Sequence, residues 1–199
     1  MFSAEGIKAD PKKTDTIANC EAPKNVSEIR SFLGMAQYVA RFIPDFASRT
    51  EPLRRLTRKD VPWEWTQQEQ EAFDNSKEAL TSTQVMAYFN PTKQTEVPVD
   101  ASPVGVGAIL AQEGKIIACA SRVLTDIEQR YSQTDREMLA VVFSVKCFHL
   151  YLYGSNFTVY TDHKPLLGIY KRQKLVTTRT ERWRLWLIPY DMTLKYRPG

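Results

Sequence analysis

Three carboxylic acids in the second half of the chain stand where their side chains could meet. Asp100 lies inside the strand-like run TEVPVDAS, Glu137 in the first turns of a predicted helix, and Asp162 at the end of the run FTVYT. Clustered carboxylates repel one another unless a cation neutralises them, and oxygen ligands without a nearby cysteine suit Mg²⁺ or Mn²⁺. Two such ions about 3.5–4 Å apart are a standard arrangement for phosphodiester cleavage. The acids therefore predict a two-ion site, provided that the first and fourth predicted strands are neighbours.

Each acid also has a structural interpretation. Asp162 could open a turn, because an Asp side chain often bonds the backbone that follows it. Glu137 completes a capping box with Thr134, although the box that begins at Ser132 is equally good and would free Glu137. Asp100 has the weakest structural reason, since Asp is depleted in strands and costly to bury unpaired. The pattern by itself leaves these alternatives open.

The C-terminal stretch is basic. Residues 171–199 carry eight Lys or Arg against two acids, whereas the rest of the chain has a net charge of −2. The candidate contacts with nucleic acid in this stretch are Arg179, Arg182, Trp183 and Arg197. Cations mixed with aromatic rings are typical of a surface that meets phosphates and bases. A solvated helix face can have the same composition, so composition alone does not separate the two.

The first half of the chain has helical periodicity. Asn25 and Thr66 are cap signals for two amphipathic helices, the first with an apolar stripe from Ile29 to Ala40. Pro44 and Pro52 favour two short helices in the segment that joins these two amphipathic helices. We therefore predict a small helical bundle over residues 1–90.

The periodicity changes to that of strands near residue 91. Three short runs separated by few residues predict an antiparallel meander, and a long helix from Ser132 or Thr134 to about Leu152 follows. The chain then continues with a strand, a helical segment and a last strand. These are the run FTVYT, the segment after Pro165 and the run DMTLKYR. Residues 91–199 thus predict a mixed sheet with flanking helices, and the whole chain an α+β protein.

Other protein classes are excluded or disfavoured. No run approaches the ~18 apolar residues that a membrane span needs, and no secretory signal is visible. The three cysteines are scattered, which disfavours a disulfide framework and a zinc site, and we interpret them as small core residues. No address is visible, so localisation stays open between a cytoplasmic particle and the nucleus.

Several long motifs carry a resemblance to a known family. FTVYTDHKPL, VDASPVGVGAILAQ, YSQTDREMLAVV, RTERWRLWL and YRPG are similar to the ribonuclease H region of gypsy-type long-terminal-repeat retrotransposon polyproteins. EIRSFLGMAQYVARFIPDFA, PLRRLT and WEWTQQEQEAF resemble the segment just before that region. The resemblance covers essentially the whole chain in the same order.

The resemblance implies a ribonuclease H fold that cuts the RNA strand of an RNA–DNA hybrid with two divalent ions. Asp100 of VDAS, Glu137 of DREML and Asp162 of TDH match the catalytic, metal-binding carboxylates. Residues 1–90 match the thumb-like region of reverse transcriptase, whose basic residues would contact phosphates. The basic residues concerned here include Arg30, Arg41, Arg54 and Arg55.

The chain also departs from the family pattern. Val99 replaces the usual Thr before the first Asp, and Arg197 stands where many relatives of the wider fold have a His. The family's final helix, with a fourth metal-binding Asp, would follow Gly199, and the polymerase palm is not among these residues. We therefore expect no polymerase activity from this chain, with palm and fingers as partners in a longer product. A catalytically inactive or domesticated remnant, which only binds nucleic acid or is structural, is the alternative.

Overall fold

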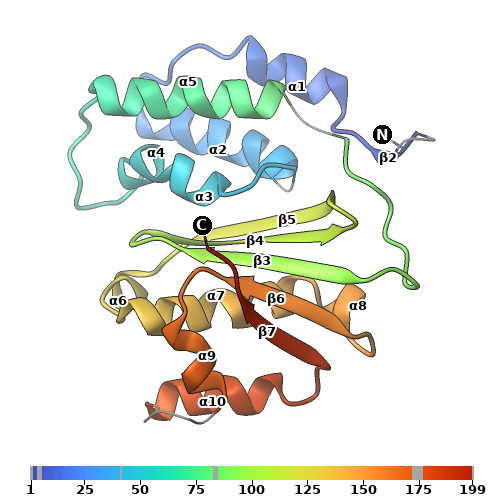
Figure 1. The fold of residues 1–199 in the computed structure, drawn as a ribbon. Coiled ribbons are helices and arrows are strands. Elements are labelled where there is room, and N and C mark those ends of the chain that lie inside the picture. The colour runs from blue at the N-terminus through green and yellow to red at the C-terminus, as the bar shows by residue number, and fades with distance from the viewer. Residues whose placement is uncertain (1, 4–5, 41, 83–84, 172–176, 199) are drawn as a thin grey trace.

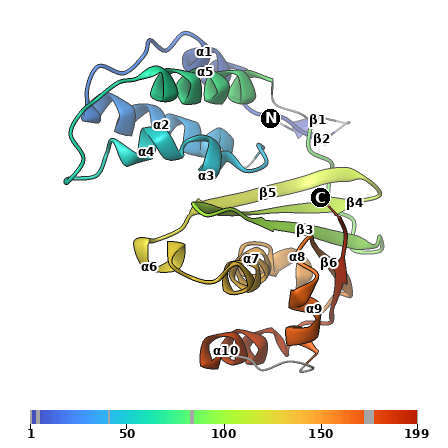
Figure 2. The same cartoon turned by 60° about the vertical axis from the view of Figure 1, so that its left-hand side comes forward.

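A five-stranded mixed sheet lies between two groups of helices (Figures 1 and 2). The structure is a computed structural model, and it describes residues 2–3, 6–40, 42–82, 85–171 and 177–198. In both views the N-terminal helices lie on one side of the sheet and the helices that follow β5 lie on the other. No helix in this described part combines the length and hydropathy that crossing a membrane requires.

The N-terminal group contains the helices up to residue 81. Its members are α1 (Pro11–Ala18), α2 (Val26–Ala40), α3 (Phe46–Arg49), α4 (Glu51–Arg55) and α5 (Gln67–Thr81). A two-stranded antiparallel pair, β1 (Phe2–Ser3) with β2 (Gly6–Ile7), precedes them. The apolar stripe predicted for α2 is buried, and Thr66 caps α5 in a capping box with Glu69. The helix α1 was not predicted, because its eight residues PKKTDTIA hold a single buried apolar side chain, Ile17.

The strands occur in the predicted order. They are β3 (Thr95–Ala101), β4 (Gly105–Gln112), β5 (Lys115–Val123), β6 (Phe157–Thr161) and β7 (Met192–Tyr196). Their spatial order is β5-β4-β3-β6-β7, with antiparallel pairing among β3, β4 and β5 and parallel pairing of β6 with both β3 and β7. The neighbouring positions of the first and fourth strands of this sheet, which the metal-site hypothesis requires, are thereby confirmed.

The second group of helices follows β5 in sequence. It consists of α6 (Asp126–Gln129), α7 (Gln133–Cys147), α8 (His149–Leu152), α9 (Pro165–Tyr170) and α10 (Thr178–Leu187). The helix α7 packs against β3 and β4 through small side chains such as Ala140 and Ser144, both fully buried. Val97, Val99 and the apolar face of α7 form the core on this side of the sheet.

Two predictions need correction, one about the end of α7 and one about the cysteines. The helix predicted to reach Leu152 ends at Cys147, because Phe148 leaves the helical conformation and its ring is buried, and a separate turn, α8, follows. The cysteines are not all core residues. Cys119 is buried, but Cys20 is half-buried and Cys147 is exposed at the end of α7, where Phe148 takes the buried position.

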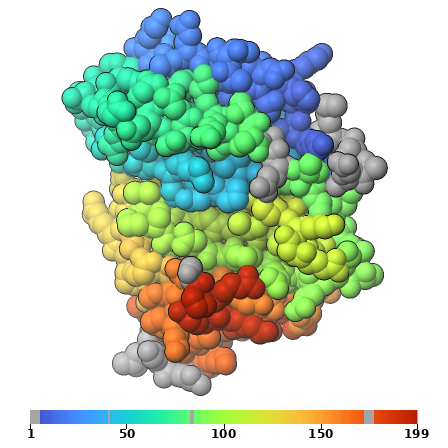
Figure 3. Space-filling view, turned by 45° about the horizontal axis from the view of Figure 1, so that its top comes forward, coloured from blue at the N-terminus to red at the C-terminus, as the bar shows by residue number. Residues whose placement is uncertain are grey.

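The N-terminal helices pack directly on the sheet. Cys119 of β5 belongs to the core of these helices, and Ile109 and Ile116 of the sheet pack against it. The backbone N–H of Ala47 in α3 donates to Ser121 Oγ of β5 at 3.0 Å. Figure 3 shows the side chains of the N-terminal part meeting those of the strands along a continuous boundary. The proposed boundary near residue 90 is therefore not a separation in space, and it stays a prediction.

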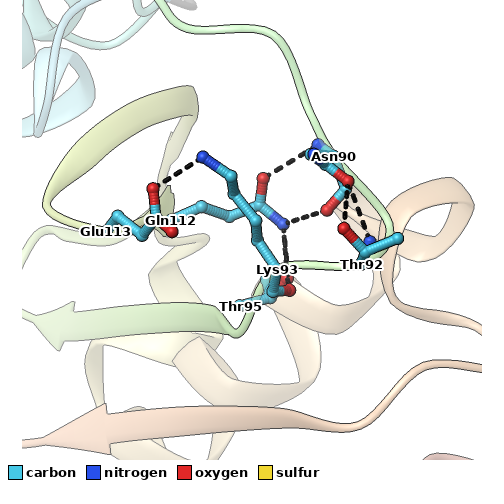
Figure 4. A network of polar contacts seen from close by, with 6 residues as sticks. All are labelled: Asn90, Thr92, Lys93, Thr95, Gln112 and Glu113. Atoms are coloured by element: carbon cyan, nitrogen blue, oxygen red, sulfur yellow. Dashed lines mark hydrogen bonds and ion pairs between the residues drawn. The ribbon is translucent and has the colours of Figure 1, made fainter.

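A buried glutamine fixes the segment that joins the two halves (Figure 4). Gln112, 3% exposed, accepts from Asn90 N–H at 2.9 Å and donates to Asn90 O at 2.8 Å and Thr95 Oγ1 at 3.0 Å. Lys93 and Glu113 form an ion pair at 2.6 Å beside it. The amide thus supplies the acceptor for the Asn90 N–H and shares the Asn90 carbonyl with the backbone N–H of Lys93.

We predict that Gln112→Leu lowers the free energy of unfolding by about 1–3 kcal/mol, because the Asn90 N–H would lose its acceptor and Thr95 Oγ1 its donor. Urea denaturation checks this, with the exposed Gln68→Leu on α5 as the matched control. A change at Gln112 no larger than that at Gln68 would show that the network does not contribute to stability.

Candidate metal and nucleic-acid site

The three predicted acids meet at one edge of the sheet. The parallel strands β3 and β6 pair Pro98 with Tyr160, and Asp100 and Asp162 each stand two residues further on. Glu137 reaches them from α7. One carboxylate oxygen from each acid lies within 4.8 Å of those of the other two. The structure therefore brings together all three residues that the sequence predicts as metal ligands.

The cap of α7 explains why Glu137 is available. Ser132 is the N-cap, and its Oγ accepts from Asp135 N–H at 3.1 Å. Of the two capping boxes that the sequence allowed, the structure has the cap at Ser132, so Glu137 does not bond the start of the helix. Its side chain points toward the strand ends instead and is almost fully buried.

Two hydrogen bonds hold the Glu137 carboxylate. Gln133 Nε2 donates to Oε1 at 2.7 Å, and Thr161 Oγ1 donates to Oε2 at 3.3 Å. Next to Asp162, His163 Nε2 lies 2.8 Å from Thr134 Oγ1, which ties the loop after β6 to α7. His163 thus has a hydrogen-bonding role beside the acids.

The acids perturb one another. Burial raises the pKa of Glu137 to about 7, the bonds from Gln133 and Thr161 oppose the rise, and the charges of Asp162 and Asp100 add to it. Burial also raises the pKa of Asp100, with further contributions from Asp162 and from Asp45 of the N-terminal helices. The sheet edge therefore concentrates negative charge that favours a bound cation.

The donor set fits a hard divalent ion. Asp100, Glu137 and Asp162 offer carboxylate oxygens only, and neither a thiolate nor an imidazole belongs to the cluster among the described residues. Oxygen ligands of this kind suit Mg²⁺ and Mn²⁺. These three residues could hold a metal ion, and the two exposed acids, Asp100 and Asp162, leave the site open to solvent.

A basic hollow lies beside the start of α7. Tyr131, Arg179, Arg182 and Trp183 line it together with the cap of α10, and its volume is about 620 Å³. Arg179 lies 3.7 Å above the ring of Tyr131, and its Nη1 is 3.3 Å from Asp135 Oδ2. Three of the four predicted nucleic-acid contacts thus share one surface. Tyr131 was not identified from the sequence, where a lone aromatic before the helix carried no distinct signal.

The fourth predicted contact, Arg197, lies elsewhere. Its backbone N–H donates to Thr161 O at 3.0 Å, which places it next to the strand end that carries Asp162. The guanidinium lies 3.6 Å above the ring of Tyr160 and forms an ion pair with Glu96 at 3.1 Å. It is therefore near the acids but separate from the hollow.

The arginines expected to contact phosphates in the first half have partners within the protein. Arg55 forms an ion pair with the buried Glu69 at 3.1 Å, Arg54 Nε donates to Thr50 Oγ1 at 3.1 Å, and Arg30 donates to the Thr57 carbonyl at 3.1 Å. Arg41 lies outside the described residues. These contacts give Arg30, Arg54 and Arg55 structural roles, and their contact with phosphates stays a prediction.

Comparison with known proteins agrees with this architecture. Residues 65–159 match the family described as the RNase H-like domain found in reverse transcriptase. The whole chain is 34% identical to the Transposon Tf2-3 polyprotein of Schizosaccharomyces pombe, and equally to the Tf2-4 polyprotein. In both cases the aligned part is 16% of the relative, so the chain spans about one sixth of the length of these polyproteins.

Two solved structures have the same fold over 98% of this chain. One is the foamy viral protease-reverse transcriptase in complex with RNA/DNA hybrid, with a TM-score of 0.80, 22% identity and 28% of that chain covered. The other is the foamy viral protease-reverse transcriptase dRH in complex with ds DNA, with a TM-score of 0.77, 23% identity and 36% of that chain covered. The predicted α+β fold of the ribonuclease H type is confirmed.

The raised pKa of Glu137 predicts a pH-dependent penalty in the metal-free protein. The folded state holds this proton up to about pH 7, whereas the ordinary value is 4.5, so the folded state binds more protons between these values. Its stability therefore falls as the pH rises through this window. As the pH rises from 4.5 to 7, the free energy of unfolding of Glu137→Gln should therefore increase relative to that of the wild type by up to about 3 kcal/mol. This figure follows because one pKa unit corresponds to ~1.4 kcal/mol.

Urea denaturation in EDTA at several pH values measures this difference. The penalty should shrink when Mg²⁺ is added. A pH-independent difference between Glu137→Gln and the wild type would contradict the raised pKa.

Proposed function

We propose that this chain, which is similar along its whole length to retrotransposon polyproteins and matches the RNase H-like domain found in reverse transcriptase over residues 65–159, hydrolyses the RNA strand of RNA–DNA hybrids. The observation that carries the proposal is the convergence of Asp100, Glu137 and Asp162, whose ligand oxygens lie within 4.8 Å of one another. Residues 91–199 form the nuclease in this proposal, and residues 1–90 form a thumb-like region that supports the hybrid.

The three acids act as ligands of two divalent ions, Mg²⁺ or Mn²⁺. When bound, such ions activate a water and stabilise the leaving oxygen of a phosphodiester. Glu137, buried and hydrogen-bonded on both oxygens, fixes the inner side of the site. Asp100 and Asp162 are exposed, so they face the substrate.

The hollow formed by Tyr131, Arg179, Arg182 and Trp183 binds the hybrid in this proposal. Arg182 is exposed, and the half-buried ring of Trp183 lies 6.2 Å from that of Tyr131. Arginine near aromatic rings supports contact with phosphates and stacking on bases without reading sequence. Arg197, whose backbone bonds the end of β6 and whose guanidinium is paired with Glu96, is a further contact with the hybrid in this proposal.

The reaction belongs to reverse transcription in a longer polyprotein. The relatives are polyproteins of which this chain matches about one sixth, and the polymerase palm and fingers would be its partners there. The foamy viral structure that shares the fold is a protease-reverse transcriptase in complex with RNA/DNA hybrid.

Asp100→Asn should abolish cleavage of a labelled RNA–DNA hybrid in Mg²⁺ or Mn²⁺, because the site loses one of its charged ligands. Gel analysis of the products measures this, with Asp126→Asn, an exposed acid on α6, as the control. Cleavage without divalent ions, or equal cleavage by Asp100→Asn and the wild type, would contradict the proposal.

Arg182→Ala should weaken hybrid binding and reduce the slope of log affinity against log salt by about 1, since one phosphate contact is lost. Fluorescence anisotropy at several salt concentrations measures the slope in the presence of Ca²⁺. Lys115→Ala removes an exposed charge at the opposite end of the strands and is the control. Equal slopes for both variants would place the hybrid on another surface.

A further inference from the structure

Gln133 makes contacts that link Glu137 to the end of β3. Its Nε2 donates to Glu137 Oε1 at 2.7 Å and to the carbonyl oxygen of Ala101 at 3.1 Å. Ala101 is the last residue of β3 and follows Asp100 directly. One amide nitrogen therefore ties the second acid of the cluster to the backbone beside the first.

A second link joins Glu137 to β6. Thr161 Oγ1 donates to Glu137 Oε2 at 3.3 Å and accepts from the backbone N–H of His163 at 3.1 Å. Thr161 and His163 flank Asp162 in the sequence. One oxygen of the Glu137 carboxylate is thus held by Gln133, which also bonds the end of β3. The other oxygen is held by Thr161 at the end of β6.

A hydrogen bond from Arg136 favours one orientation of the Gln133 amide. Arg136 Nη2 donates to Gln133 Oε1 at 2.7 Å. A reversed amide would direct two N–H groups at a guanidinium and an oxygen at two acceptors, so this bond favours the observed orientation. The same guanidinium has a buried Nε without a hydrogen-bond partner, the only such side-chain atom among the described residues, and no ion pair with an acid is found for it there.

We propose that Gln133, oriented by Arg136, is a positioning residue that holds the Glu137 carboxylate in place for metal binding. This inference rests on the proposed function. Outer-shell partners of metal ligands orient those ligands, and their loss typically costs ~10–100-fold in metal affinity or activity. Gln133 itself contacts neither the substrate nor the metal in this proposal.

The proposal predicts a specific set of kinetic effects. Gln133→Ala should lower kcat and the affinity for Mg²⁺ by ~10-fold or more, with the KM for the hybrid within about twofold of the wild type. Arg136→Met should have a smaller effect in the same direction, and Arg136→Lys, which keeps a cationic donor, should restore most of the loss. Isothermal titration calorimetry with Mg²⁺ provides a readout that does not depend on cleavage.

Gln67→Ala is the matched control. Gln67 Nε2 donates to Glu71 Oε1 at 3.0 Å, so it makes the same bond across four residues of a helix, but on α5. Both alanine variants should unfold at nearly the same temperature as the wild type. An effect of Gln133→Ala no larger than that of Gln67→Ala, or a rise in KM with unchanged kcat and Mg²⁺ affinity, would overturn the positioning role.

The outcomes also separate this inference from the proposed function. If the wild type binds Mg²⁺ but does not cleave, the proposed function fails, and the calorimetric comparison still decides whether Gln133 positions Glu137. If the wild type does not bind Mg²⁺, both are overturned.

Discussion

Parallel pairing of β3 with β6 brings Asp100 and Asp162 to the same edge of the sheet, where α7 adds Glu137. Three carboxylates so close together repel one another, and burial makes the ionised form of Glu137 still less favourable. The surrounding structure compensates only in part. The hydrogen bonds from Gln133 and Thr161 support the charged form, but the raised pKa shows that they do not outweigh burial and repulsion. A bound cation would offset the remaining repulsion.

The rest of the chain gives this edge its rigidity and its surroundings. Small residues let α7 lie close to the sheet, and the cap at Ser132 leaves the Glu137 side chain free to reach the strand ends. On the other face, the N-terminal helices cover β4 and β5, and Gln112 fixes the connecting segment. Arg179 and Trp183 place positive charge and aromatic surface beside α7. The acids are thus supported from both faces of the sheet, and Asp100 and Asp162 remain open to solvent.

Much of this arrangement could be predicted from the sequence, because it depends on local patterns. Periodicity and caps predict α2, α5 and the five strands of the main sheet, and an Asp within a strand marks Asp100 as unusual. The adjacency of β3 and β6 could only be assumed, since it depends on pairing between residues some 60 positions apart. Gln133 and Tyr131 could not be identified, because their roles depend on which neighbours the fold brings to them. Cys147 was misplaced because the apolar pattern does not show that Phe148 ends α7 and takes the buried position.

The central claim is that Asp100, Glu137 and Asp162 together bind divalent cations. A crystal structure of the protein soaked in Mn²⁺, with anomalous scattering used to locate the ions, tests it most directly. We predict anomalous peaks within about 2.5 Å of the carboxylate oxygens of these three residues, with a pair of ions when a hybrid is bound. Peaks confined to other acids, with none between β3, β6 and α7, would contradict the account.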